Sequence, residues 1–243
     1  MRAFAALVAT TLRQQLGGRR LLLLLALGLI PAGVLAVLLA QERTAAGAVR
    51  AFHQAPLPIL FFVVLPVASL VLGAGALGDE RRDGTLSFIL LRPLPRTMLA
   101  AAKLLGAWLA ALSVAAIGAA AAGLLLGARF HEWGALGPLL LAVALSSLAY
   151  TSVFLTLGYL TARAVLLGLV YVFVWESGMT SAIPSLASVS LMRIGLSAYG
   201  RGGIEDLLGV VRPGAGGALA KVAVVAAAAV AAVALLLRRR DVT

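Results

Sequence analysis

Two residue types that carry much of protein chemistry are scarce or missing in this sequence. There is no cysteine among its 243 residues, which excludes disulfide bonds and thiol chemistry, and there are only two histidines. Both histidines, His53 and His131, fall in predicted loops without further metal ligands nearby, so we interpret them as surface or interface residues. Ser177 and Gly178 could suggest an intramembrane serine protease. Neither histidine lies in a long apolar run, however, so this serine lacks the base that would activate it. The sequence predicts no catalytic residue and no metal site.

Charged residues are also scarce. They make up 12% of the chain, about half the share in soluble proteins, whereas 62% of the residues are apolar. A soluble domain of this size would need more polar surface, so the composition predicts an integral membrane protein. Unpaired backbone groups are costly in lipid, and the short alternating strands of a membrane barrel are not seen. We therefore expect helical spans.

The apolar residues gather in six runs, and each run is expected to form one transmembrane helix. The runs cover residues 21–40, 58–77, 98–127, 136–160, 164–176 and 217–237. The first run exceeds the roughly 7 to 15 apolar residues of a signal peptide, which favours a retained span. Pro66 lies inside the second run and predicts a kink. The predicted fold class is an all-α membrane protein with one domain over residues 1–243.

The segments outside the runs complete this predicted domain. Residues 1–18 carry an apolar stripe that predicts a helix lying in the membrane interface. The stripe consists of Phe4, Leu7, Val8, Leu12 and Leu16. Residues 41–56 are expected to form a polar loop because they include several charges. Residues 177–216 alternate apolar patches with glycine, proline, serine and charges, which predicts an irregular extracytoplasmic segment.

The net charge of +11 suggests nucleic-acid binding on a soluble protein, but here the positions of the basic residues explain it. With six spans, both termini lie on one side, and that side holds most of the 20 lysines and arginines. These are Arg2, Arg13, Arg19, Arg20, Arg81, Arg82, Arg92, Arg96, Lys103, Arg163 and Arg238 to Arg240. Cytoplasmic loops carry an excess of basic residues, so we expect both termini to be cytoplasmic and no nucleic acid to bind.

Residues 79–96 form the one substantial loop between spans on this predicted cytoplasmic side. An ionic stretch from Asp79 to Asp83 leads into about two turns of apolar helix, which two prolines end. A helix this short is unstable alone and needs a partner surface. That surface is either the membrane bundle itself or a groove on a separate protein. The alternative interpretation is a charged loop without a binding role, whose basic residues only reflect its cytoplasmic location.

The order of residues in this loop follows a pattern that resembles a known family. The pattern E-x-x-x-G-T-L-x-x-x-L-L-x-P-x-x-R-x-x-x-x-x-x-K closely resembles the loop between the second and third spans of ABC-2 type transporter permeases. Its residues here are Glu80, Gly84, Thr85, Leu86, Leu90, Leu91, Pro93, Arg96 and Lys103. The six-span layout, the N-terminal helix and the irregular segment 177–216 extend the resemblance over the whole chain.

The resemblance implies a membrane subunit that does not act alone. In that family the loop carries a coupling helix that sits on a separate ATPase subunit, so Phe88 and Ile89 are expected at that contact together with the motif residues. It also implies a second permease copy or a paralogue, surrounding lipid, and residues 177–216 as a re-entrant hairpin. Export from a bacterial or archaeal plasma membrane is the family's usual role.

Nucleotide binding is not expected in this chain. The two lysines, Lys103 and Lys221, both follow an alanine, so neither completes the Gly-Lys-Ser/Thr ending of a phosphate-binding loop. The chain is therefore predicted not to be an enzyme by itself and to hold no cofactor. ATP and magnesium would be bound by the partner ATPase.

Glu176 is the one acidic residue well inside an apolar run. An acid at such a depth is costly and faces a cavity or a partner. One reading places Glu176 in a substrate path or gate, and the other makes it a polar anchor for Ser177, Thr180 or the backbone of the re-entrant segment. Arg193 is a candidate ion partner.

Two other classes of function remain open at this point. A secondary transporter or channel would work without ATP, but it predicts paired charges within several spans. A membrane scaffold would not respond to nucleotide at all. The substrate, and the choice between homodimer and heterodimer, do not follow from the sequence.

Overall fold

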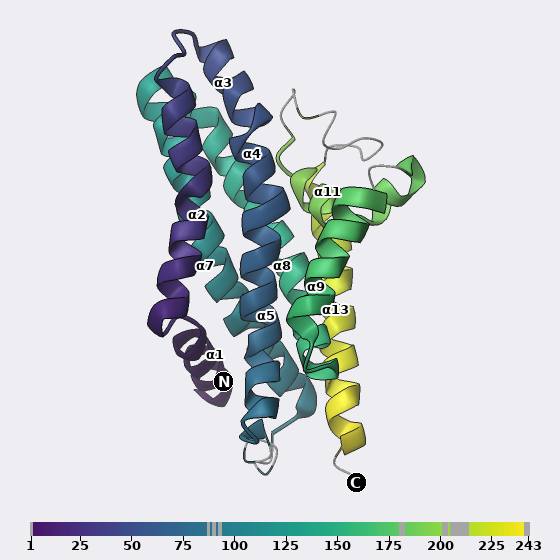
Figure 1. Cartoon of the computed structure of the whole chain (residues 1–243). Coiled ribbons are helices and arrows are strands. Elements are labelled where there is room, and N and C mark those ends of the chain that lie inside the picture. The colour runs from purple at the N-terminus through teal and green to yellow at the C-terminus, as the bar shows by residue number, and fades with distance from the viewer. Residues whose placement is uncertain are drawn as a thin grey trace.

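The computed structural model describes residues 2–86, 88, 91, 94–179, 183–200, 204 and 214–240. Every regular element in this part of the chain is a helix, as predicted, and the long ones run side by side (Figure 1). The elements are α1 (Arg2–Gln15), α2 (Gly18–Leu39), α3 (Ala45–Gln54), α4 (Pro56–Pro58), η1 (Ile59–Val64), α5 (Leu65–Arg82), α7 (Arg96–Phe130), η2 (Trp133–Ala135), α8 (Leu136–Leu160), α9 (Ala164–Val170), η3 (Tyr171–Met179), η4 (Pro184–Val189), α11 (Leu191–Leu196) and α13 (Ala215–Arg240).

Five helices of the described chain are long and apolar enough to cross a membrane. They cover Gly18–Leu39, Ala45–Arg82, Arg96–Phe130, Trp133–Leu160 and Ala215–Arg238. Five of the six predicted spans are thus confirmed as long apolar helices. The other predicted span is the shorter apolar helix Ala164–Glu176. At a rise of about 1.5 Å per residue it covers roughly 20 Å, less than the hydrocarbon core of about 30 Å.

The prediction of a polar loop at residues 41–56 is wrong, because most of this segment is helix α3. The hydroxyl of Thr44 accepts a hydrogen bond of 3.1 Å from the N–H of Gly47 and so caps the helix. Ala48, Ala51 and Phe52 form a buried face on the bundle. Of the charges that suggested a loop, Glu42 and Arg43 precede the helix, and Arg50 is exposed on its surface.

The second span changes helix type before its internal proline. The segment η1 is a π-helix, and α5 begins directly after it, with Pro66 in its first turn. Proline lacks an N–H and its ring crowds the preceding turn of an α-helix, so a wider turn just before it relieves both problems. The sequence predicted a kink at Pro66 but not the π-helix that precedes it.

The helices pack closely where glycines face each other. A Cβ atom added to Gly118 of α7 would lie 1.9 Å from the carbonyl oxygen of Gly28 on α2. One added to Gly158 of α8 would lie 2.2 Å from the carbonyl oxygen of Ala74 on α5. No side chain fits at these distances, so both crossings depend on glycine.

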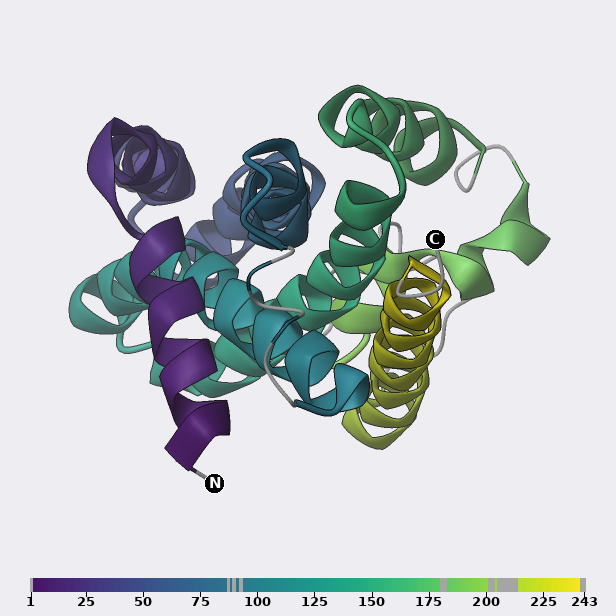
Figure 2. The same ribbon diagram turned by 90° about the horizontal axis from the view of Figure 1, so that it is seen from below.

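Helix α1 lies across one end of the bundle and packs on α7 (Figure 2). The five residues of its predicted apolar stripe are partly buried, while Arg2 and Arg13 are exposed. Figure 1 shows that α1, the end of α5 and the end of α13 lie at the same end of the molecule. Helices α3 and α11 lie at the opposite end.

Candidate functional site

The turn after α5 brings together the first residues of the loop motif. Helix α5 ends at Arg82, and the N–H of Asp83 donates to the carbonyl oxygen of Asp79 at 2.9 Å. Gly84 follows with φ 69°, in the left-handed region that favours glycine. The hydroxyl of Thr85 donates to the carbonyl oxygen of Glu80 at 3.3 Å. The turn thus folds the chain back onto the end of α5.

The apolar side chains of this loop differ in exposure. Leu86 is buried in a cluster formed by residues of α5, α7, α8 and α13. Phe88 and Leu91 are instead 72% and 81% exposed. Ile89, Leu90 and Pro93 lie outside the described residues. The loop is therefore held to the bundle at Leu86 and presents two large apolar side chains away from it.

A buried ion pair lies beside this loop. Lys103 of α7 donates to Oε1 of Glu80 on α5, and both side chains are buried. The other carboxylate oxygen, Oε2, has no hydrogen-bond partner among the described residues. Leaving one buried charge unpaired costs about 3–5 kcal/mol, so this pair holds the start of α7 against the end of α5. The sequence indicated both residues but not that they contact each other.

A second connection, which the sequence did not predict, runs from α5 across the bundle. Arg81 donates a hydrogen bond to the backbone carbonyl of Tyr159 on α8, and its guanidinium lies 5.9 Å from the centre of the tyrosine ring. The hydroxyl of Tyr159 donates to the carbonyl oxygen of Leu236 on α13 at 3.3 Å. The motif residue Arg96 is the first residue of α7, and it is partly exposed. A displacement of the end of α5 would thus reach both α8 and α13.

The second predicted site surrounds Glu176 at the opposite end of the molecule. This side chain is 1% exposed, and its Oε1 accepts hydrogen bonds from the Tyr171 hydroxyl at 3.1 Å and the Leu191 N–H at 2.9 Å. Its Oε2 accepts from the hydroxyl of Ser190. That hydroxyl in turn accepts from the N–H of Arg193 at 3.1 Å and caps α11. Glu176 therefore joins η3 to the start of α11.

The proposed ion partner Arg193 lies close to this site. It is buried in α11, and its Nε has no hydrogen-bond partner among the described residues. Hydroxyl and backbone donors such as those on Glu176 stabilise the charged form of a buried carboxylate, and an ion pair with Arg193 stays a prediction. The nearby segments η4 and α11 lie within the predicted re-entrant segment 177–216.

The two histidines occupy different environments. The expectation of a loop is wrong for His53, which lies in α3 and is buried, with its Nε2 3.1 Å from the hydroxyl of Tyr199. His131 follows α7, with φ 60°, and is exposed. Within the residues that the structure describes, no group of three or more histidine, aspartate or glutamate side chains is placed to hold a metal ion.

Comparison with known families agrees with the loop motif. A family model described as an ABC-2 family transporter protein matches residues 19–190, which is more than half of the chain. The chain therefore belongs to the ABC-2 family, and the resemblance seen in the loop is confirmed. It is a multi-pass membrane protein and the membrane component of an ABC transporter, a class in which this subunit is not the catalytic one. No curated protein matches the chain at a significant level.

Proposed function

We propose that this chain is the permease subunit of an ATP-driven exporter and that residues 79–96 dock on a separate ABC ATPase subunit. The observation that carries this proposal is the exposure of Phe88 and Leu91, directly after the anchored Leu86. Exposed apolar side chains on a short helical segment are suited to a groove on another protein. ATP and magnesium are bound by that partner.

Movement of the docked loop would pass into the bundle through two connections. The ion pair between Glu80 and Lys103 joins α5 to α7, so both helices move with the loop. The contacts of Arg81 with Tyr159 extend the connection to α8 and α13. Closure of the ATPase dimer would then open a translocation path between this chain and a second copy or a paralogue. Reciprocity requires that occupancy of the path also change nucleotide affinity.

The proposed topology has six crossings and both termini in the cytoplasm of a bacterial or archaeal cell. The common end of α1, α5 and α13 carries most of the basic residues (Figure 1), which supports a cytoplasmic location. Helix α9 with η3 provides the remaining crossing and leads into the re-entrant hairpin. At that end Glu176 acts as the polar anchor of the hairpin, and through it as part of the outer gate.

The test is recovery of an ABC ATPase with the tagged full chain in mild detergent. Phe88→Asp and Leu91→Asp should each abolish recovery of the ATPase, because a carboxylate cannot be desolvated in an apolar groove. Val189→Asp, at an aliphatic residue of η4 that is 57% exposed, is the control and should leave recovery unchanged. Wild-type chain that transports with no ATPase bound would instead support a secondary transporter or channel.

A further inference from the structure

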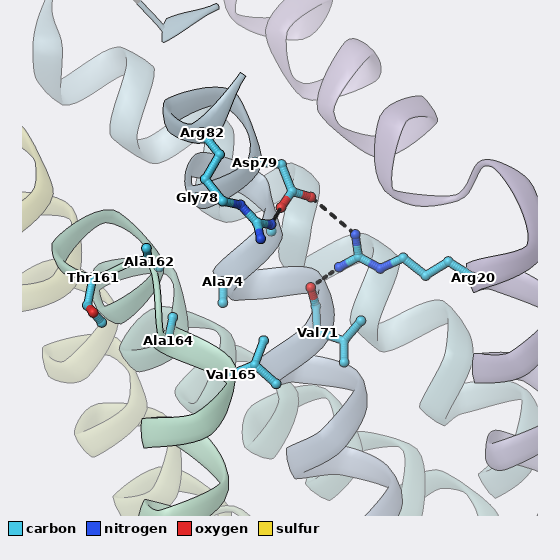
Figure 3. A pocket seen from close by; sticks show the side chains of 12 residues that line it. Arg20, Val71, Ala74, Gly78, Asp79, Arg82, Thr161, Ala162, Ala164 and Val165 are labelled. Carbon is cyan, nitrogen blue, oxygen red and sulfur yellow. Dashed lines mark hydrogen bonds and ion pairs between the residues drawn. The ribbon is translucent and has the colours of Figure 1, made fainter. Parts of the chain in front are cut away.

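The basic end of the bundle contains a pocket with three charged side chains, which borders the start of the proposed docking segment. It has a volume of about 240 Å³ and lies between α2, α5 and the turn that joins α8 to α9. Figure 3 shows Arg20 reaching into it from α2 and Arg82 from α5, with Asp79 between the two guanidinium groups. Its other lining residues are Val71, Ala74, Gly75, Gly78, Gly158, Thr161, Ala162, Ala164 and Val165. We call this the Arg20 pocket.

Arg20 is held in place but keeps hydrogen-bonding capacity. One guanidinium nitrogen lies 3.3 Å from Oδ2 of Asp79 and the other donates to the carbonyl oxygen of Val71. Its Nε is buried and has no hydrogen-bond partner among the described residues. A Cβ atom added to Gly75 would lie 2.7 Å from this guanidinium, so the glycine leaves the room that the arginine occupies.

The charges of the pocket favour a singly charged anion. Two arginines and one aspartate line it, which leaves one positive charge in excess. Arg82 is bonded to Asp79 but its side chain is 62% exposed, so it can also turn toward a bound group. Arginine binds phosphate oxygens through its fork of N–H donors. A phosphodiester carries one negative charge and matches this excess.

The surface next to the pocket is apolar in the direction of the membrane. Immediately after Arg20, Leu22 and Leu23 on α2 are 68% and 73% exposed. On the other flank, Leu166 of α9 is 62% exposed. Both helices begin at this end and lie on either side of α5 (Figures 1 and 2). A ligand with a phosphate group and long apolar chains would therefore be contacted along its whole length.

We propose that the Arg20 pocket binds the phosphodiester headgroup of an anionic phospholipid. The phosphate accepts from the terminal guanidinium nitrogens of Arg20 and from Arg82, and the acyl chains lie along α2 and α9. Basic pockets between transmembrane helices recognise anionic lipids in this way. A bound lipid would contact α2, α5 and the α8–α9 turn together.

Native mass spectrometry of the full chain tests the proposal, with phosphatidylglycerol and phosphatidylcholine titrated separately in mild detergent. Phosphatidylglycerol should bind at least about tenfold more tightly, because the choline cation of phosphatidylcholine offsets the charge of its phosphate and is repelled by the excess positive charge of the pocket. Arg20→Gln should remove that preference, because it removes this excess charge. Arg82→Gln provides the same test at a more exposed residue if Arg20→Gln fails to fold. Ala162→Leu, which fills the pocket without changing charge, should also weaken binding.

Two further variants distinguish lipid binding in the pocket from attraction by the overall positive charge of this end. Asp79→Asn should strengthen binding of phosphatidylglycerol, because it removes the competing carboxylate, whereas damage to the fold would weaken it. Arg238→Gln removes an exposed arginine at the same end but outside the pocket and should have no effect.

Three results would overturn the proposal. They are equal binding of the two lipids, equal loss in Arg20→Gln and Arg238→Gln, and weaker binding in Asp79→Asn. A separate arm adds inorganic phosphate alone. If phosphate binds with the same dependence on Arg20 and fully displaces phosphatidylglycerol, the site takes a free anion and the lipid assignment is wrong.

Discussion

At the scale of single residues, the pair formed by Glu80 and Lys103 shows that residues of the loop motif can act by stabilising the packing of the bundle. Both charges are buried, and each makes the burial of the other tolerable. Twenty-two residues separate them in sequence, so their contact depends on how α5 and α7 pack. The motif therefore indicates two residues whose direct role is to position the loop.

This role predicts a distinctive pattern of stability. Glu80→Ala or Lys103→Ala should lower the free energy of unfolding by about 3–5 kcal/mol, because one buried charge is left alone. Replacing both residues by leucine should cost less than either single change. Thermal unfolding of the purified chain measures all three variants. Additive losses in the double variant would contradict a direct pair.

Glu176 predicts a different pattern, because hydroxyl and backbone donors surround its carboxylate. Glu176→Ala should destabilise the chain by about 2–4 kcal/mol and make residues 177–216 more sensitive to protease, since several donors lose their acceptor. Asp83→Asn, at an exposed acid in the turn after α5, is the control and should change neither property. A Glu176→Gln and Arg193→Gln double variant with wild-type stability would instead indicate that the two side chains form an ion pair.

At the scale of elements, two glycines of the bundle differ sharply in their surroundings. Gly118 on α7 faces the backbone of Gly28, whereas Gly33 on α2 has nothing within 4 Å of an added Cβ atom. Both glycines lie in helices, so the same substitution tests only packing.

The two changes should act in opposite directions. Gly118→Ala should separate α2 from α7 and cost about 1–3 kcal/mol. Gly33→Ala should be neutral or stabilise by up to about 1 kcal/mol, because alanine favours helix. Thermal unfolding of both variants in one detergent provides the comparison. Equal effects at the two positions would mean that the α2–α7 crossing does not depend on close approach.

The elements also show what hydropathy can and cannot predict. The run at 136–160 coincides with α8, since a span must be long, apolar and helical in lipid. Helix α3 was missed because it is short and Phe52 is the one large apolar side chain among its buried residues, beside glycine, alanine and His53. The π segments η1 and η3 leave no clear signal in the sequence, because helix periodicity barely distinguishes them from α-helix.

At the scale of the whole molecule, two groups of residues lie at opposite ends. The loop residues, the Arg20 pocket and the end of α13 share one end, and Glu176 with α11 lies at the other (Figure 1). The sequence singled out the loop residues and Glu176 from local patterns, but not the Arg20 pocket. It did not predict the contacts of Glu80, Arg81 and Arg20, because these partners are brought together only by tertiary packing.

The absence of cysteine makes the central claim directly measurable, since an introduced cysteine is the only thiol in the chain. Phe88→Cys and Leu91→Cys should react with a membrane-impermeant maleimide added from the cytoplasmic side. Reaction should fall at least about tenfold when the ATPase subunit is bound, because the docked side chains are desolvated. Val189→Cys, at the opposite end, should react only with reagent added from the external side, and its reaction should be unaffected by the ATPase. Unchanged labelling of both loop cysteines with the ATPase bound, or labelling from the external side, would contradict the account.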